Sequence, residues 1–210
     1  MIGRQTVKYA CAFALVLIMV AFILLACFAM VMVAHGQTPK RLYDSLDNGS
    51  YLIVYDPALK IPVAADWVCS ADFLGKSQRE PSWRFTEDSR VARPRATHDD
   101  YTRSGYDRGH LCPAADRSAS AQMMKSTFIM TNVCPQVPRL NRGDWKRLET
   151  SCRAIANHGR PLAIHVDAVF WRADTERIGR NAVAVPHGFV KTVRDFFTDT
   201  ICYSKYFQNW

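Results

Sequence analysis

The residues best suited to chemistry lie between positions 106 and 153. His110 ends a segment that reads as extended, and a stretch with helical periodicity begins near Asn141. Glu149 follows Asn141 by eight residues, about two helical turns along and roughly 80° round, so both side chains can border one pocket. Arg153 comes four residues later, the spacing at which side chains pair on one helix face. The spacing predicts a histidine that faces a carboxamide and a carboxylate.

These residue types suit hydrolysis of a phosphodiester bond. The reaction needs an activated water, a cation near the charge that develops at phosphorus, and a stabilised leaving oxygen. A neutral histidine can take the proton of water because its pKa lies near neutral pH. A hard cation such as Mg²⁺ serves the other needs while keeping most of its waters. We expect Asn141 to supply one direct oxygen and Glu149 to hold metal-bound water, with Arg108 and Arg153 on phosphate oxygens.

Each of these residues also has a purely structural interpretation. A lone histidine is more often structural or exposed than catalytic, and Asn141 can simply cap a helix. Glu149 and Arg153 can form an ordinary surface ion pair. The arrangement of the residues, and not their types, favours the chemical interpretation.

The charge balance of the chain is permissive. The 210 residues carry a formal net charge of +8. A basic domain attracts polyanions, which include nucleic acid, anionic lipid and cell-wall polymers. The charge therefore agrees with a phosphodiester substrate without selecting it.

Residues 1–36 are predicted to be an N-terminal signal anchor or signal peptide. No residue from Tyr9 to Ala34 is charged, and this run exceeds the roughly 20 residues that cross a bilayer. Arg4 and Lys8 precede it, as in the positive region of an export signal. An uncleaved membrane anchor is favoured over a signal cut after Gly36. We expect the remaining chain to be exported, either anchored outside the cytoplasm or secreted or periplasmic.

The rest of the chain divides into a tether, residues 37–50, and one domain, residues 51–210. A helix is expected over 140–158, with a core face formed by Trp145, Leu148, Cys152 and Ile155. Strands are expected at 51–55, 63–73, 127–132 and 162–170, with an interrupted strand at 183–190. Residues 75–105 are expected to be a solvated loop whose six arginines could contact phosphate. Because strands and helices mix without regular alternation, the expected class is α+β.

The cysteines predict some disulfide pairing. Two of the seven, Cys11 and Cys27, lie inside the apolar run. In an oxidising compartment some of the other five should pair, although an odd number leaves at least one free or joined to another chain. The absence of a C-x-x-C spacing argues against a structural zinc site.

Three blocks of sequence carry a resemblance to a known family. They are DRGHLCPAAD at 107–116, TFIMTNVCPQ at 127–136 and LNRGDWKRLE at 140–149. In their order and spacing they resemble the DNA/RNA non-specific endonucleases, the ββα-metal nucleases that include the Serratia-type secreted nuclease and mitochondrial endonuclease G. The resemblance implies a ββα-metal (His-Me finger) fold with a central antiparallel sheet.

The resemblance also implies a role for each matching residue. His110 matches the general base that deprotonates the attacking water, and Asn141 matches the single direct protein ligand of Mg²⁺, which Mn²⁺ can replace. Glu149 matches the acid that orients metal-bound water, and Asn132 matches a supporting active-site asparagine. The implied activity is metal-dependent cleavage of DNA and RNA without sequence preference.

Three arginines are assigned to the substrate. Arg108 and Arg153 match the phosphate-contacting arginines of the family, whereas Arg84 matches its upstream arginine only loosely. The sequence departs from the family at 166–170, where a glycine-proline pair is usual, and at 202–210, which do not look like the expected further strand and helix. A domain shortened at its C-terminus is therefore expected.

The sequence also allows two other classes of function. One is a membrane-tethered nucleic-acid-binding protein on an inactive nuclease scaffold, although binding alone would not need His110. The other is a hydrolase with an activated histidine or cysteine nucleophile, for which Cys112 and Cys134 are the nearest thiols. The sequence leaves the oligomeric state open.

Overall fold

The computed structural model describes residues 43–171 and 175–210 of the chain. The expected anchor, residues 1–36, lies outside this part. Within the described residues, no helix combines the length and apolar character needed to span a membrane.

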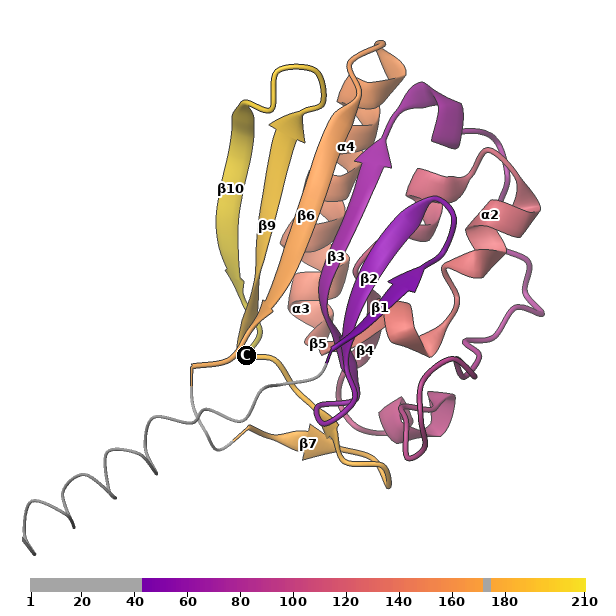
Figure 1. The fold of residues 1–210 in the computed structure, drawn as a ribbon, viewed down its shortest axis with the longest axis vertical. Helices are drawn as coiled ribbons and strands as arrows, with labels where there is room; N and C mark the ends of the chain where they lie inside the picture. Colours follow the sequence, from indigo (N-terminus) through magenta and orange to yellow (C-terminus); the bar gives the residue numbers. More distant parts are fainter. Residues whose placement is uncertain (1–42, 172–174) are drawn as a thin grey trace, which may run out of the picture. The chain divides into compact units, whose positions relative to one another are not determined.

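A six-stranded antiparallel sheet forms the frame of the domain (Figure 1), with the strand order β1-β2-β3-β6-β9-β10. Its strands are β1 (Asp44–Asp47), β2 (Tyr51–Asp56), β3 (Ile61–Cys69), β6 (Leu162–Val169), β9 (Gly188–Asp195) and β10 (Ile201–Gln208). Every neighbouring pair runs antiparallel. The α+β class and the central antiparallel sheet are thereby confirmed.

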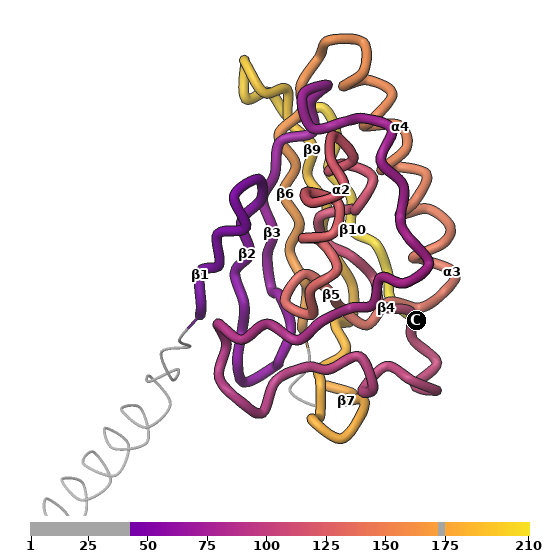
Figure 2. The backbone as a smooth tube through the Cα atoms, turned by 90° about the vertical axis from the view of Figure 1, so that its right-hand side faces the viewer, coloured from indigo at the N-terminus to yellow at the C-terminus, as the bar shows by residue number. Residues whose placement is uncertain are grey.

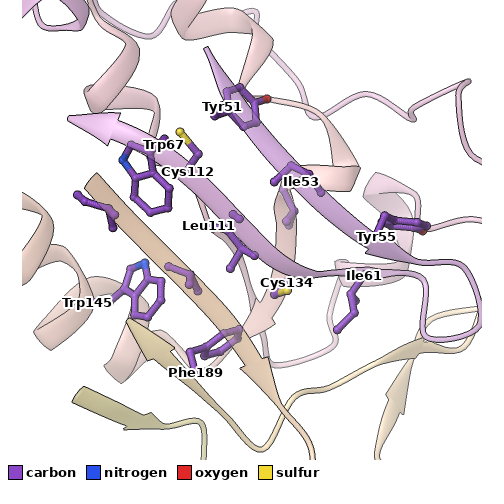
Figure 3. Packing of buried hydrophobic residues seen from close by; sticks show 14 of the residues in the cluster. Tyr51, Ile53, Tyr55, Ile61, Trp67, Leu111, Cys112, Cys134, Trp145 and Phe189 are labelled. Atoms are coloured by element: carbon purple, nitrogen blue, oxygen red, sulfur yellow. The ribbon is translucent and has the colours of Figure 1, made fainter. Parts of the chain in front are cut away.

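The sheet buries one side of its strands under the rest of the domain. In β2, the buried Tyr51, Ile53 and Tyr55 alternate with Leu52 and Val54, as the two-residue period of a strand requires. Figure 3 shows these side chains in one layer with Trp67 and Trp145. The opposite side of the sheet carries more exposed residues such as Leu52, which is 47% exposed.

The elements that carry the site lie over the buried side (Figures 1 and 2). They are the paired strands β4 (Asp107–His110) and β5 (Val133–Gln136), the helices α2 (Ala121–Ser126), α3 (Pro138–Leu140) and α4 (Lys146–Asn157), and the turn η5 (Asn141–Trp145). The chain order β4, β5, helix is the order that the name ββα describes. Short 3₁₀ turns are η1 (Ala71–Phe73), η2 (His98–Tyr101), η3 (Ala114–Arg117) and η4 (Met130–Asn132), and β7 (Arg177–Ile178) pairs with β8 (Val183–Ala184).

The long helix is confirmed with two differences. It begins at Pro138, and its backbone leaves helical geometry at Gly143, where φ is −102° and ψ is −112°. Trp145 and Cys152 face the core as expected, but Ile155 is 41% exposed and Ala156 is buried in its place. At 100° per residue, Ala156 lies about 20° from the direction of Trp145 and Ile155 about 80° from it.

The prediction of a strand at 127–132 is wrong. Residues 130–132 form the turn η4, and β5 begins only at Val133. The Cys134-Pro135 pair therefore does not close a strand but lies inside one. Proline is tolerated there because β5 pairs on one side only, with β4, so its missing N–H breaks no second ladder.

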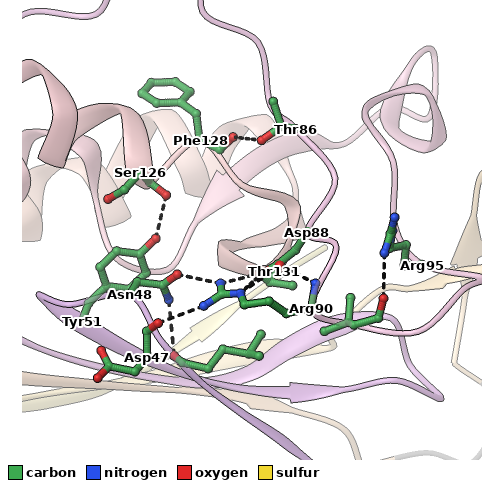
Figure 4. Close-up of polar contacts among 12 residues, drawn as sticks. Asp47, Asn48, Tyr51, Thr86, Asp88, Arg90, Arg95, Ser126, Phe128 and Thr131 are labelled. Atoms are coloured by element: carbon green, nitrogen blue, oxygen red, sulfur yellow. Dashed lines mark hydrogen bonds and ion pairs between the residues drawn. The ribbon is translucent and has the colours of Figure 1, made fainter.

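The segment 75–105 is more than a solvated loop. Its Thr86 forms a parallel bridge with Ile129, and the fully buried carboxylate of Asp88 accepts hydrogen bonds from Arg90 and Thr131 (Figure 4). Arg90 also donates to the carbonyl of Asp47 at 2.9 Å. These bonds tie the segment to the sheet edge and to the turn before β5. Arg93 and Arg95 both pair with Glu87, so half of its six arginines hold carboxylates of this segment.

Both ends of the domain differ from expectation. Four residues of the expected tether form the edge strand β1, and β10 extends the sheet at the other edge. Phe207 of β10 is buried, and Asn209 donates to the carbonyls of Pro135 and Pro186. Residues 202–210 thus do supply a further strand. Around the departure at 166–170, β6 runs unbroken to Val169 between β3 and β9.

The five cysteines of the described residues are all free. Cys202 is exposed, and Cys69, Cys112, Cys134 and Cys152 are buried. The expected pairing is therefore not found among them. Burial also raises the pKa of the Cys112 and Cys134 thiols well above the ordinary range, which argues against either as a nucleophile.

Candidate active site

A cleft of about 570 Å³ lies where the end of β4 meets η3 and the beginning of α4. It is lined by four of the residues assigned from the sequence, His110, Asn141, Glu149 and Arg153. Arg142 and Lys146, from the same helical stretch as Asn141, and Arg79, from a distant segment, also line this cleft. The structure therefore places one imidazole, one carboxamide, one carboxylate and several cations around a single space.

His110 is held by strand pairing and by aromatic packing. It is paired with Val133 of β5, and the preceding Gly109 lies so close to the side chain of Gln136 that a Cβ would collide with it. The imidazole packs against Phe85 and Phe128, with ring centroids 5.0 and 5.1 Å away. Its Nε2 is buried without a hydrogen-bond partner among the described residues.

The surroundings of His110 keep its imidazole neutral. Burial first, and then the positive charge of Arg79, lower the pKa of His110 to about 4. A neutral imidazole has a lone pair available at neutral pH, which is what a general base needs.

Asn141 is oriented by a carboxylate on the strand that carries His110. Its Nδ2 donates to Oδ2 of Asp107 at 2.9 Å. Arg142 donates to both oxygens of the same carboxylate, at 2.6 and 2.8 Å. Although burial acts to raise the pKa of Asp107, the bonds from Arg142 and Asn141 keep it below its ordinary value. Because the amide NH₂ is used in this way, the carboxamide oxygen of Asn141 is left for another ligand.

Glu149 is held against a buried lysine. Burial raises its pKa to about 7, while Lys191 acts to lower it. The Nζ of Lys191 lies 3.5 Å from Oε1 of Glu149, and the side chain of Lys191 is only 1% exposed. The same Nζ lies 3.7 Å from the ring centroid of Trp145 and 5.4 Å from that of Trp67. The lysine is therefore held by one carboxylate and two aromatic faces.

Arg153 is fixed by a second buried carboxylate. It donates through Nη1 to Oδ1 of Asp116 at 2.8 Å, and Trp67 donates to the other oxygen at the same distance. Asp116 is fully buried. The guanidinium of Arg153 thus reaches the cleft from a rigid anchor and retains donors for a further anion.

Three residues assigned from the sequence do not line the cleft. Arg108 donates to the carbonyl of His98 and the hydroxyl of Thr102. Arg84 donates to the carbonyl of Pro81 at 2.6 Å. Their contact with substrate stays a prediction.

Asn132 is the third of these residues, and it is fully buried. Its amide accepts from the N–H of Cys112 and donates to the carbonyls of Cys112 and Thr127. It therefore supports the backbone that follows His110, in line with the supporting role expected of it, without reaching the cleft.

Three further residues join the site without having been assigned a role from the sequence. Arg79 was only one of six arginines in an irregular segment, and Asp116 was only the last letter of a matching block. Lys191 had no local signal, because it is separated from Glu149 by 42 residues (191 − 149) and meets it only through the sheet.

The comparison with known sequences decides the family. Residues 35–205 match the pattern of the DNA/RNA non-specific endonuclease family, which covers most of the chain. The chain belongs to this family. Its members are metal-dependent nucleases.

Individual relatives agree with this placement. The chain is 36% identical to mitochondrial endonuclease G of Bos taurus over 159 residues, which is 70% of this chain and 52% of that protein. It is 33% identical to a nuclease of Nostoc sp. over 132 residues, 61% of this chain and 48% of that protein. The chain thus spans about half the length of these relatives.

A solved structure shares the fold. The structure of an EndoG/EndoGI complex superimposes with a TM-score of 0.72 and 24% sequence identity, covering 83% of this chain and 82% of that one.

The residues of the cleft fit a hard divalent cation. The unshared carboxamide oxygen of Asn141 and the carboxylate of Glu149 are oxygen donors, which Mg²⁺ and similar ions prefer. Among the described residues there is no group of three or more histidine, cysteine, aspartate or glutamate side chains suited to hold a metal. Two oxygen donors suit an ion that keeps most of its waters.

A first prediction concerns the buried pair. Replacing Lys191 by Met removes the cation beside the buried Glu149, which must then keep an unpaired charge or take up a proton, and we expect the free energy of unfolding to fall by about 3 kcal/mol. The double variant Lys191→Met/Glu149→Gln removes both charges and should recover most of that loss. Urea unfolding at neutral pH measures both. Equal destabilisation of the single and double variants would show that Lys191 acts through packing alone.

A second prediction concerns pH. Unfolded His110 gains a proton below its ordinary pKa of 6.5, whereas folded His110 stays neutral down to about pH 4. Protons therefore stabilise the unfolded chain in this window, and His110 should cost up to about 3 kcal/mol of stability as the pH falls from 6.5 to 4.

Comparison with His110→Gln isolates this effect, because Glu149 titrates in both proteins. Urea unfolding at pH 7 and at pH 4.5 should show the wild type losing more stability than the variant. The same loss in both would mean that His110 is not held neutral.

Proposed function

We propose that the protein is a Mg²⁺-dependent endonuclease that hydrolyses phosphodiester bonds of DNA and RNA without sequence preference. The observation that carries the proposal is the shared cleft, where a neutral His110 faces the oriented carboxamide of Asn141. Membership of the DNA/RNA non-specific endonuclease family supports it independently.

His110 acts as the general base. Its imidazole is neutral at neutral pH, so its lone pair is free to take a proton from the water that attacks phosphorus. Packing against Phe85 and Phe128 fixes the plane of the ring, so the lone pair is held in one direction. Little reorganisation is then needed when the substrate arrives.

The other side chains hold the substrate and the ion. Asn141 would provide a direct oxygen ligand to the ion, and Glu149 would hold water bound to it. When bound, Mg²⁺ stabilises the charge that develops on the phosphoryl group and on the leaving oxygen. Arg153 and Arg79 provide guanidinium donors for non-bridging phosphate oxygens, and they supply positive charge where negative charge grows.

Lack of sequence preference follows from the chemistry of the cleft. Its cationic side chains suit phosphate oxygens, and contacts to phosphate carry no direct base information. The same groups serve DNA and RNA because both polymers have this backbone.

We place this activity outside the cytoplasm, as part of the same proposal. The support is the uncharged run from Tyr9 to Ala34, which suits a membrane anchor or an export signal. The competing function is a tethered protein that binds nucleic acid without turnover. A preserved neutral base in the cleft argues against it, because binding alone gains nothing from that base.

Cleavage of plasmid DNA and total RNA by the full chain, with Mg²⁺ or with EDTA, tests the proposal. Both substrates should be degraded only with the ion. His110→Ala should lose activity by about 10²–10⁴-fold, the usual contribution of a general base, while still binding DNA.

His158→Ala is the matched control, because His158 is exposed at the end of α4 and does not line the cleft. It should cleave like the wild type. Near-full activity of His110→Ala would refute the assignment of the base. A folded wild type that binds DNA and cuts neither polymer would favour the tethered binder.

A further inference from the structure

A second groove, of about 530 Å³, lies on the other side of the helical turn that carries Asn141. It runs between that turn and the edge strand β10. Leu140 and Gly143 line this groove, whereas Asn141 and Arg142 line the catalytic cleft. Because consecutive Cα atoms are only about 3.8 Å apart, the two hollows are separated by a single turn of backbone.

The groove is basic. Arg139, Arg147 and Lys205 line it, and Asp144 is its only acidic residue. Asp144 already pairs with Arg147. Arg139 and Lys205 have no acidic partner within the described part of the chain. Lys205 lies over the ring of Phe207, 5.2 Å from its centroid, which leaves its charge unneutralised. Two cations without an acidic partner beside one ion pair favour an anionic occupant.

The groove also presents exposed aromatic rings. Trp210 is 61% exposed and Tyr206 is 39% exposed. Neither ring is loose: Trp210 packs edge-on against Trp171 at 5.3 Å, and the Tyr206 hydroxyl donates to the carbonyl of His187 at 3.0 Å. Rings that are held in place yet left open to solvent, beside unpaired cations, suit the stacking of bases.

A ridge of cations connects the groove to the cleft. Arg142 and Lys146 belong to the cleft and Arg147 to the groove, and all three lie on one stretch at the beginning of α4. All three are exposed. Arg142 pairs with Asp107 and Arg147 with Asp144, whereas no acidic partner is found for Lys146 in the described part of the chain. The three exposed side chains lead over the helix end, where a sugar-phosphate backbone can compete for the two paired arginines and contact Lys146.

We propose that this groove binds the part of a single-stranded nucleic acid that extends beyond the cleaved bond. Arg139 and Lys205 contact its phosphates, and Trp210 stacks on one of its bases. The inference rests on the proposed function, because it makes the groove a continuation of the catalytic cleft. A protein partner or a second copy of the chain would not account for the ridge that leads to the catalytic residues.

Binding of labelled oligothymidylates to the full chain tests the groove, measured by fluorescence anisotropy in EDTA with a His110→Ala background. One oligomer has about 5 nucleotides, enough for the cleft, and the other about 15, enough for both hollows. Trp210→Ala should weaken binding of the long oligomer about tenfold, the loss of one stacked base, and leave the short one within about twofold. Trp210→Phe should restore most of the loss.

The contribution of Arg139 and Lys205 is measured separately, through the salt dependence of binding. Arg139→Ala/Lys205→Ala should reduce the slope of log affinity against log salt for the long oligomer by about 1.4, since each phosphate contact to a single strand contributes about 0.7. The matched controls are Phe197→Ala, an aromatic that is 79% exposed, and Arg180→Ala, and neither residue lines either hollow. Both controls should leave binding and slope unchanged.

Three results would overturn the inference. The first is that Trp210→Ala weakens binding of the short and the long oligomer equally. The second is that folded Trp210→Ala binds the long oligomer as tightly as the unsubstituted chain does. The third is that Trp210→Ala loses self-association while its nucleic-acid binding stays intact. The last would make the groove an interface between copies. If the wild type cuts nothing but shows the Trp210-dependent length effect, the groove assignment stands and the proposed catalysis fails.

Discussion

The hydrogen bond from Asn141 to Asp107 joins the two halves of the site, and the rest of the geometry depends on it. Asp107 begins the strand that ends at His110, while Asn141 begins the turn that leads to Glu149 and Arg153. One 2.9 Å contact therefore sets the base relative to the carboxamide, and it also determines which amide atom faces the cleft. Arg142 keeps Asp107 ionised, so the acceptor in this bond remains charged.

Two buried ion pairs support the other half of the site. Lys191 with Glu149 and Arg153 with Asp116 lie under the cleft, between the sheet and α4, and Trp67 contacts both pairs. Buried pairs add little net stability, because removing two charges from water costs about as much as their attraction returns. Their value here is orientation. They hold a carboxylate and a guanidinium at the edge of the cleft on side chains that cannot swing freely.

The same packing moves two pKa values in opposite directions. Burial beside a positive arginine lowers that of His110 to about 4, and burial raises that of Glu149 to about 7 despite the nearby lysine. A base that is unprotonated at neutral pH and an acid close to its titration point suit different tasks in one reaction. Neither shift requires unusual residues, since depth and neighbours are sufficient causes.

Sequence reasoning found the parts of the site whose geometry is local. Asn141, Glu149 and Arg153 lie on one helical stretch, and their spacing alone places them on one side of it. His110 could be added because its motif occurs in a fixed order relative to that helix. Arg79 and Lys191 were not predicted as site residues. They reach the site from distant segments, and only the folded sheet brings them there.

The errors in the predicted elements have two different causes. Ile155 was placed inward by a spacing of three or four residues, although the accumulated rotation turns it out of the core and Ala156 into it. The strand at 127–132 was predicted from β-favouring residues, but side-chain and bridge contacts of Asn132 and Ile129 hold a turn there. At 129–132, local preference was overruled by contacts with Thr86 and Cys112, which lie far along the chain.

Cleavage measured over a range of Mg²⁺ concentrations in Asp107→Ala tests the central claim most directly. Asp107 is expected not to touch the ion, so its loss should change the ion dependence by freeing the Asn141 carboxamide, although it also frees the guanidinium of Arg142. The half-saturating Mg²⁺ concentration should rise about 10–100-fold, the usual cost of losing a partner behind a metal ligand, with much of the rate recovered at saturating ion. Asp144→Ala, an exposed acid on the same turn, should leave it unchanged. An unchanged Mg²⁺ dependence in folded Asp107→Ala would contradict the account.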